Sequence, residues 1–243
     1  MRSDDPTYVR EQYAVEDGLA ARASIYGGGG TDVRDVVLEE LARVRPERLL
    51  EVGCGWGELA ERIADELECR VVALDQSERM VELSRERGVD AHVADVQALP
   101  FGDDEFDAVV AAWMLYHVPA LDRALSECAR VLRAGGTFIA VTNAAADFSE
   151  LWDLVGRDTS SRLLTFRAEN GEETLSRHFD HVSKHDVLGE VVFNDSDAVR
   201  RYVGSSSLGR QYLDGIPELT EPLVARKRVT VFVATTRSER VPG

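Results

Sequence analysis

The residues best suited to holding a ligand are three glycines at alternate positions, Gly53, Gly55 and Gly57. They follow residues 48–52, which are predicted to form a short buried strand, and apolar residues at helical spacing come next. Glycine adopts backbone angles that other residues avoid, and without a side chain it lets a ligand lie against the main chain. The spacing is narrower than the Gly-x-Gly-x-x-Gly loop that holds a pyrophosphate. The turn is therefore compatible with a nucleoside without phosphates.

Two carboxylates follow the next two predicted strands. Asp75 ends the strand predicted at 71–74, and Asp95 follows the weaker strand predicted at 89–94. A carboxylate at the first position can accept hydrogen bonds from both hydroxyls of a ribose. A carboxylate at the second position could accept a hydrogen bond from the amino group of an adenine. Each acid alone could equally be a helix cap or a solvated turn residue. Because ligands of open α/β sheets bind at the carboxyl ends of the strands, the glycines and both acids together predict a nucleoside site.

His117 is the candidate catalytic base at the same edge of the predicted sheet. It lies just after the continuous apolar strand predicted at 106–113, where it could take a proton from a bound molecule. A hydrogen-bonded histidine that only fixes the loop is an equal alternative. Trp113 and Tyr116 could wall a neighbouring pocket, although Trp113 could also complete the core of its strand.

Metal binding is not predicted. Three histidines have spacings that would suit metal ligands on a helix: His178, His181 and His185. Their segment, however, is predicted to be a helix end running into a strand, which would separate the rings. The three cysteines include no Cys-x-x-Cys pair, so neither a disulfide framework nor a cysteine zinc site is expected.

The first half of the chain alternates between predicted strands and helices. Thr31 can cap a helix that Pro46 closes. Further helices are predicted at 59–67, 77–88 and 119–132, and a further strand at 137–141. Strands that are apolar on both faces, each followed by an amphipathic helix, specify a parallel sheet with helices on both sides. We therefore predict a doubly wound α/β fold.

The last hundred residues are less regular. Four short helices are predicted there, at 149–155, 172–179, 197–203 and 218–225. Two strands, predicted at 190–193 and 228–234, could pair as an antiparallel edge on the parallel sheet. The expected organisation is an N-terminal helical lid at 1–30, a ligand-binding core at 31–145, and a variable region at 146–243 whose last two strands complete the same sheet.

The composition of the chain limits the kinds of molecule that the protein is expected to bind. Among 243 residues there are 44 acids and 28 bases, which give a net charge of −16. Such a surface repels nucleic-acid phosphate and anionic lipid at ordinary salt, and adaptation to high salt is an alternative reason for it. The longest uncharged apolar run, residues 108–116, is far shorter than the roughly 20 residues of a membrane-spanning helix. The first residues, Met-Arg-Ser-Asp-Asp-Pro, lack a secretory pattern, so a cytoplasmic protein is expected.

In combination, these motifs resemble the class I (Rossmann-like) S-adenosylmethionine-dependent methyltransferases. The resemblance spans roughly residues 49–141, and the matching motifs are Glu51-Val52-Gly53-Cys54-Gly55-Trp56-Gly57, Asp75, and the segments 95–101, 106–110 and 130–136. It implies a mostly parallel seven-stranded sheet with an antiparallel edge strand and helices on both faces. It also implies S-adenosylmethionine as cofactor and S-adenosylhomocysteine as product.

The resemblance also implies roles for individual residues. Glu51 and the glycines would hold the methionine part of the cofactor. Asp75 would hold the ribose, with Gln76 beside it, and Asp95 with Val96 the adenine. The early tyrosine that often closes over the cofactor in this family could be Tyr8 or Tyr13, of which Tyr13 is included among the cofactor residues. The candidate acceptor pocket consists of Trp113, Tyr116, Arg162 and Tyr202, the last two from the region where the family varies its substrate pocket.

The leading hypothesis is methylation of a small organic molecule by a monomer or homodimer, without contact with a membrane. An RNA-modifying methyltransferase is the first alternative, because some tRNA enzymes share this core pattern. Clustering of the arginines at positions 157, 162, 167, 200, 201, 226 and 228 on one face would favour it. A non-catalytic protein that only binds S-adenosylmethionine is the second alternative.

Overall fold

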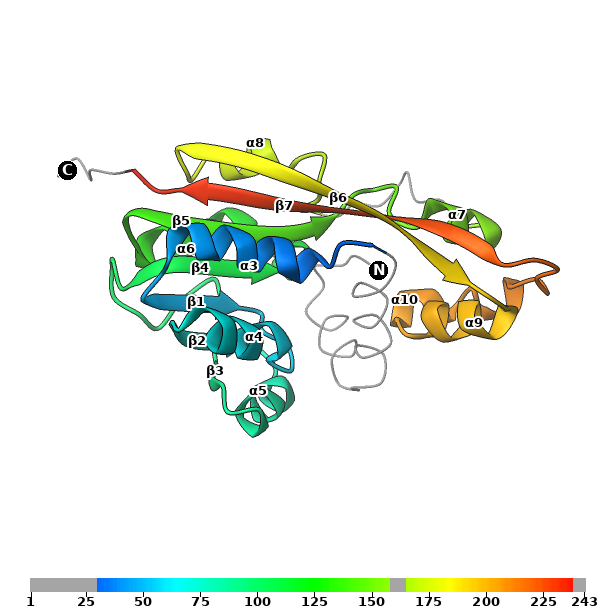
Figure 1. Ribbon diagram of the computed structural model, residues 1–243, viewed down its shortest axis with the longest axis horizontal. Helices are drawn as coiled ribbons and strands as arrows, with labels where there is room; N and C mark the ends of the chain where they lie inside the picture. Colours follow the sequence, from blue (N-terminus) through cyan, green and yellow to red (C-terminus); the bar gives the residue numbers. More distant parts are fainter. Residues whose placement is uncertain (1–29, 158–164, 238–243) are drawn as a thin grey trace.

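The computed structural model describes residues 30–157 and 165–237, and these residues form a seven-stranded sheet with helices on both faces (Figure 1). The order of the strands is β3-β2-β1-β4-β5-β7-β6. Their bounds are β1 (Arg48–Val52), β2 (Arg70–Asp75), β3 (Asp90–Val93), β4 (Phe106–Ala112), β5 (Leu132–Asn143), β6 (His181–Phe193) and β7 (Leu223–Thr235). The predicted doubly wound α/β fold is confirmed.

The helices of the first half follow the strands they connect. They are α3 (Val33–Val44), α4 (Glu58–Leu67), α5 (Glu78–Glu86), the single 3₁₀ turn η1 (Leu115–His117) and α6 (Leu121–Val131). The second half contributes α7 (Ser149–Leu154), α8 (Gly171–Leu175), α9 (Ser196–Gly204), α10 (Ser207–Arg210) and the 3₁₀ turn η2 (Leu213–Gly215). Within the described part of the chain, none of these helices has the length and apolar character needed to cross a membrane.

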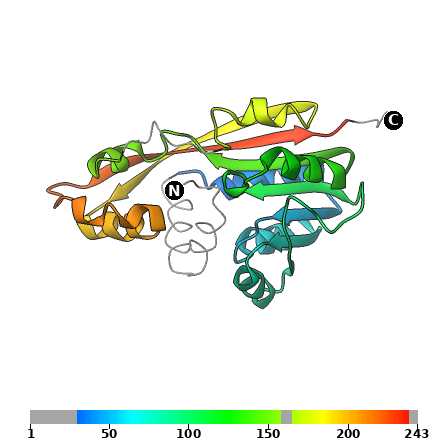
Figure 2. The ribbon, with the colours of Figure 1, turned by 180° about the vertical axis from the view of Figure 1, so that it is seen from behind.

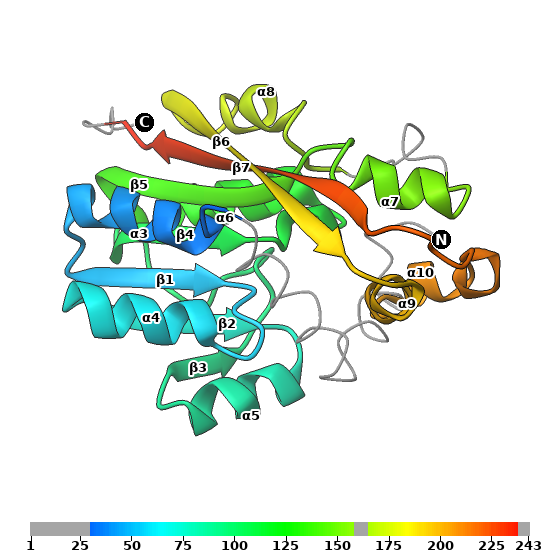
Figure 3. The ribbon, with the colours of Figure 1, turned by 45° about the vertical axis from the view of Figure 1, so that its right-hand side comes forward.

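The central strands are apolar because they are covered on both faces. Leu49 on β1 points into a core formed with α3 and α4, which lie together on one face of the sheet (Figure 3). The next residue, Leu50, points into the opposite core, which α6 covers (Figure 2). Both leucines are fully buried. Continuous apolar runs are what a parallel sheet buried on both sides requires.

The two C-terminal strands form a long ribbon that extends beyond the rest of the sheet. The antiparallel strand, β7, lies between β5 and the edge strand β6. It pairs with β5 only through residues 229–235, whereas it pairs with β6 over its full length. The projecting half of the ribbon carries a separate apolar cluster with α7 and α9. These two helices lie at one end of the molecule in Figure 1.

Three predictions in the second half are wrong in their bounds or type. The helix predicted at 218–225 does not form, because Pro222 lacks a backbone donor and disfavours helical geometry in the residue before it, and β7 begins at Leu223. The strand predicted at 190–193 is the end of β6, which begins at His181. Its first half is polar because it lies at the edge of the sheet with only one neighbour. The helix predicted at 172–179 is shorter, since α8 ends at Leu175.

Smaller differences concern the ends of elements in the first half. Asp32, and not Thr31, caps α3, and its side chain accepts a hydrogen bond from the amide of Arg34. The predicted strand at 137–141 begins already at Leu132, directly after α6. A shift in the pairing of β4 with β5 accommodates the extra residues, among them Gly135, whose φ is +71°.

Candidate functional site

The glycine turn after β1 adopts a conformation that depends on its glycines. Gly53, Gly55 and Gly57 have φ angles of +71°, +55° and +83°, in the left-handed region that strains other residues. The carbonyl of Leu74 on β2 accepts hydrogen bonds from the amides of Gly53 at 2.7 Å and Cys54 at 2.9 Å. The turn is thereby fixed against the end of the neighbouring strand.

Asp75 ties this turn to the beginning of α5. One carboxylate oxygen accepts a hydrogen bond from the Gly55 amide at 3.0 Å, and the other accepts one from the Ser77 amide at 2.9 Å. Burial raises the pKa of Asp75, and hydrogen bonds from the amides of Ser77, Gly55 and Gln76 oppose that shift. A carboxylate offers about four acceptor positions, so Asp75 keeps capacity for the hydroxyls of a ligand.

Glu51, the fourth residue of β1, is a buried acid with an incomplete set of partners. Its relative exposure is 2%, and one of its carboxylate oxygens, Oε2, has no hydrogen-bond partner. Burial and the nearby Asp75 raise the pKa of Glu51 to about 8, against a lowering by the amide of Ala60 at the start of α4. A buried oxygen without a partner is unusual in a folded protein, and here it lies beside a turn shaped to admit a ligand.

Asp95 and Val96 lie at the same edge of the sheet, beyond the end of β3. The exposed Asp95 carboxylate accepts hydrogen bonds from the Gln97 amide at 2.8 Å and from the Gln97 side chain at 3.0 Å. Gln97 in turn accepts a hydrogen bond from the amide of Ala120, just before α6. Val96 is buried in the core. Gln76 is exposed and directly follows Asp75.

The segment after β4 brings three predicted residues to this edge. Trp113 is half-buried and has a φ of +54°, which is rare for a bulky residue and typical of functional loops. Its indole nitrogen donates a hydrogen bond to the side-chain oxygen of Asn143 at 3.0 Å. Tyr116 and His117 follow within η1, and their half-buried rings contact each other edge to face, with centroids 4.5 Å apart. The segment lies against the glycine turn, because a side chain at position 53 would be 2.7 Å from Met114.

Sequence analysis missed two residues that shape this site. Ser84 is fully buried in α5, and its hydroxyl donates a hydrogen bond to the carbonyl of Gly55 at 2.8 Å. Asn143 ends β5 and orients Trp113. The position of Asn143 at the carboxyl end of a predicted strand was the available signal, whereas Ser84 looked like an ordinary helix residue.

Of the remaining candidate residues, the structure describes Tyr202. Tyr202 packs in the projecting cluster, where its ring centroid is 5.4 Å from that of Phe148 and 5.7 Å from that of Phe193. The structure therefore gives Tyr202 a packing position apart from Trp113 and Tyr116. Three further candidates lie outside the described residues: Tyr8, Tyr13 and Arg162.

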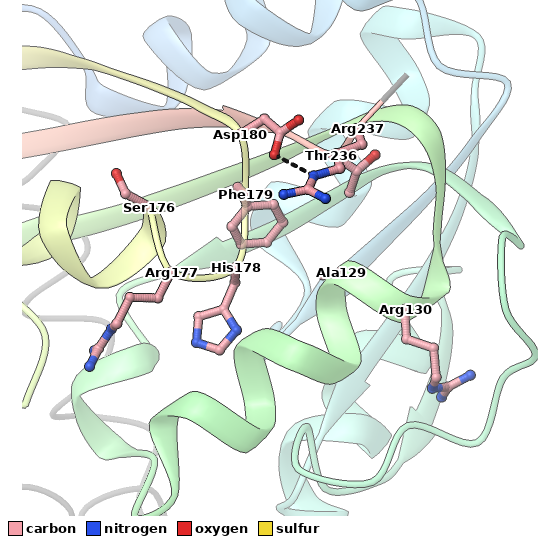
Figure 4. A pocket seen from close by; sticks show the side chains of 9 residues that line it. All are labelled: Ala129, Arg130, Ser176, Arg177, His178, Phe179, Asp180, Thr236 and Arg237. Carbon is pink, nitrogen blue, oxygen red and sulfur yellow. Dashed lines mark hydrogen bonds and ion pairs between the residues drawn. The ribbon is translucent and has the colours of Figure 1, made fainter. Parts of the chain in front are cut away.

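The three histidines considered as metal ligands lie in a turn and on a strand, and Figure 4 shows the side chain of His178 in the turn. His178 precedes β6 and its ring nitrogen is 3.0 Å from the Asp122 carboxylate, whereas His181 and His185 lie on β6 itself. His185 is 3.3 Å from Glu40 on α3. In the part of the chain that the structure describes, no group of three or more potential ligands is arranged to hold a metal ion.

Fold and site together define a class of protein. A doubly wound sheet, a glycine turn after β1, and carboxylates after β2 and β3 are the features of an α/β protein that binds a nucleoside-containing cofactor at the carboxyl edge. The unpartnered Glu51 oxygen fits such a ligand.

Comparison with known proteins identifies the family. Residues 50–140 match the family model described as "Methyltransferase domain". The ubiquinone/menaquinone biosynthesis C-methyltransferase UbiE of Dinoroseobacter shibae is 34% identical over 210 residues, which cover 82% of this chain and 72% of that protein. A putative methyltransferase of Bacillus halodurans shares the fold, with a TM-score of 0.61 and 20% identity over 83% of this chain and 98% of that one. The chain therefore belongs to the S-adenosylmethionine-dependent methyltransferase family, and its cofactor is accordingly S-adenosylmethionine.

The chain spans about half the length of some of the curated relatives it matches. The alignment with UbiE of Methylobacterium nodulans, 36% identical over 135 residues, covers 52% of this chain and 51% of that protein. The family match confirms the resemblance drawn from the glycine turn and its acids.

Proposed function

We propose that this protein transfers a methyl group from S-adenosylmethionine to a small organic acceptor by in-line displacement. The observation that carries the proposal is the Asp75 carboxylate, which accepts a hydrogen bond from the glycine turn and keeps acceptor capacity at the carboxyl edge. The bound cofactor supplies a methyl group already activated by its sulfonium. The protein then has to align the acceptor and exclude water, and alignment alone can lower a barrier by about 7–11 kcal/mol.

In this proposal, different residues around the turn bind different parts of the cofactor. Glu51 and the glycines at 53, 55 and 57 bind the methionine part, and Asp75 with Gln76 binds the ribose. Asp95 and Val96 bind the adenine. All of these residues lie at or just beyond the carboxyl ends of β1, β2 and β3, which are adjacent in the sheet.

The acceptor is placed on the β4 side of the cofactor, where Trp113, Tyr116 and His117 follow the strand. The hydrogen bond from Trp113 to Asn143 would hold the indole ring as one side of the acceptor pocket. His117 is the proposed base for an acceptor that must lose a proton. A small acceptor is favoured by the UbiE relatives, which are named for quinone biosynthesis.

The charge of the protein also favours a small acceptor over RNA. The net charge is −16, and several arginines considered for an RNA surface contact acids: Arg200 with Asp197 and Glu218, and Arg226 and Arg228 with Glu150. We propose that the protein acts in the cytoplasm as a monomer or homodimer.

The proposal is tested by incubating the protein with S-adenosylmethionine and a panel of hydroquinones, phenols, amines and carboxylates. Formation of S-adenosylhomocysteine together with an acceptor heavier by one methylene group is the expected result. Binding of S-adenosylmethionine without turnover on any acceptor would instead indicate a non-catalytic cofactor-binding protein.

The same assay tests the role of His117. For an acceptor that is deprotonated during transfer, His117→Ala is expected to lower kcat by roughly 10²–10⁴-fold, because a positioned base contributes that much, and to leave cofactor affinity unchanged. His92→Ala is the matched control, since His92 is exposed on β3 and pairs with Asp90. Equal rates for both variants would show that His117 only fixes the loop.

A further inference from the structure

Glu51 and Asp75 are two neighbouring acids with very different sets of partners. Both carboxylate oxygens of Asp75 accept backbone hydrogen bonds, at 3.0 Å from Gly55 and 2.9 Å from Ser77. Glu51 is buried more deeply, with 2% exposure, and its Oε2 has no partner. A buried carboxylate that lacks a partner for its charge is strongly disfavoured unless it takes up a proton or pairs with a cation.

The groups facing Glu51 do not supply that cation. Asp75 approaches from β2, and the thiol of Cys54 lies in the turn, where burial and then Glu51 raise the pKa of the thiol. The amide of Ala60 donates from the first turn of α4. Among the described residues, the groups that act on the Glu51 carboxyl are thus an acid, a thiol and a neutral amide. S-adenosylmethionine, in contrast, carries two positive groups, its sulfonium and its ammonium.

We infer that Glu51 holds a proton while the site is empty and releases it when a cationic ligand enters, so that binding of S-adenosylmethionine is coupled to the loss of one proton. The O–H bond of the carboxyl breaks, the proton passes to the solvent buffer, and the resulting carboxylate pairs with a positive group of the ligand. This inference rests on the proposed cofactor site and assigns Glu51 a charge state within it.

The pKa of Glu51 supports the direction of this coupling. Because burial and Asp75 raise it to about 8, the carboxyl is protonated in the empty protein at neutral pH. A ligand that binds the ionised form must displace the proton, so affinity increases with pH, by at most about tenfold per unit, until the carboxyl ionises by itself. Above about pH 8 the carboxyl is already ionised in the empty protein, so its ionisation no longer makes the affinity depend on pH.

Titration calorimetry in two buffers of different ionisation enthalpy, phosphate and imidazole, counts the protons released. At about pH 6.5 the ammonium of the ligand keeps its own proton, so any release comes from the protein. We expect close to one proton per S-adenosylmethionine and none with adenosine, which lacks both positive groups. Release with S-adenosylhomocysteine would assign the pairing to the ammonium, and its absence to the sulfonium.

Glu51→Gln keeps the size of the side chain and cannot ionise, so it is expected to abolish proton release. Glu61→Gln is the matched control, since Glu61 lies on α4 and pairs with Arg87. If the Gln variant does not fold, the inference is tested by comparing proton release with S-adenosylmethionine and with adenosine in the wild-type protein.

Wild-type protein that binds S-adenosylmethionine without proton release, or equal release with adenosine, would overturn the inference and leave the cofactor site intact. Release that persists in Glu51→Gln would overturn it as well. Failure to bind S-adenosylmethionine at all would count instead against the proposed function.

Discussion

Replacing Asp75 by alanine is expected to weaken binding of S-adenosylhomocysteine at least about 100-fold. A hydrogen bond to a charged group contributes roughly 1.5–3 kcal/mol, and the variant removes the acceptor of both ribose hydroxyls. It also leaves the Gly55 and Ser77 amides without the carboxylate that they now share. The loss of affinity therefore combines a missing contact with a loosened turn, and calorimetric titration measures both together.

Two further variants separate these contributions. Asp75→Asn keeps the shape of the side chain but replaces one acceptor oxygen by an amide group, which cannot accept from a backbone amide, so an intermediate affinity is expected. Asp95→Ala should weaken binding less, because Asp95 is exposed and its carboxylate accepts hydrogen bonds from the nearby Gln97. If Asp75→Ala binds S-adenosylhomocysteine with unchanged affinity, the assignment of the ribose to Asp75 is contradicted.

Replacing Gly57 by alanine is expected to destabilise the protein and abolish cofactor binding. A Cβ atom at this position would lie 2.8 Å from the hydroxyl and 3.0 Å from the Cα of Ser84, which is the residue that holds Gly55. Since Ser84 is fully buried in α5, α5 has to move away from the turn. The left-handed φ of +83° adds a strain of about 1–2 kcal/mol.

Gly88→Ala is the matched control for the strain alone. Gly88 has nearly the same φ, +85°, and nothing lies within 4 Å of a Cβ atom built there. We expect this variant to lose only about 1–2 kcal/mol of unfolding free energy in urea and to bind S-adenosylhomocysteine with wild-type affinity. If the two variants behave alike, the close approach of α5 to the turn has no role in the site.

The parallel half of the fold and the cofactor turn are predictable from sequence because their signals are local. Strands buried on both faces are rich in apolar residues, and the apolar residues of β1, β2 and β4 mark these strands directly. The glycines at 53, 55 and 57 predict positive φ angles by residue type alone, and the structure contains them. Asp75 follows its strand closely enough in sequence to be placed at the same edge.

The C-terminal ribbon is predicted less well because its stability comes from distant partners. The first half of β6 is polar, since it lies at an edge and β7 satisfies its backbone. The position of Tyr202 depends on how far this ribbon projects beyond β5, which no local pattern encodes. The contacts of Ser84 with Gly55 and of Asn143 with Trp113 likewise join residues about 30 positions apart.

Calorimetric titration of the wild-type protein with S-adenosylhomocysteine tests the central claim most directly, because that ligand carries the adenosine and methionine parts without undergoing reaction. Saturable binding of one ligand per chain, with a rise in unfolding free energy of about 2.7 kcal/mol at a hundredfold excess over Kd, is the predicted result. A titration that shows neither heat of binding nor any stabilisation would contradict a cofactor site at the carboxyl ends of β1, β2 and β3.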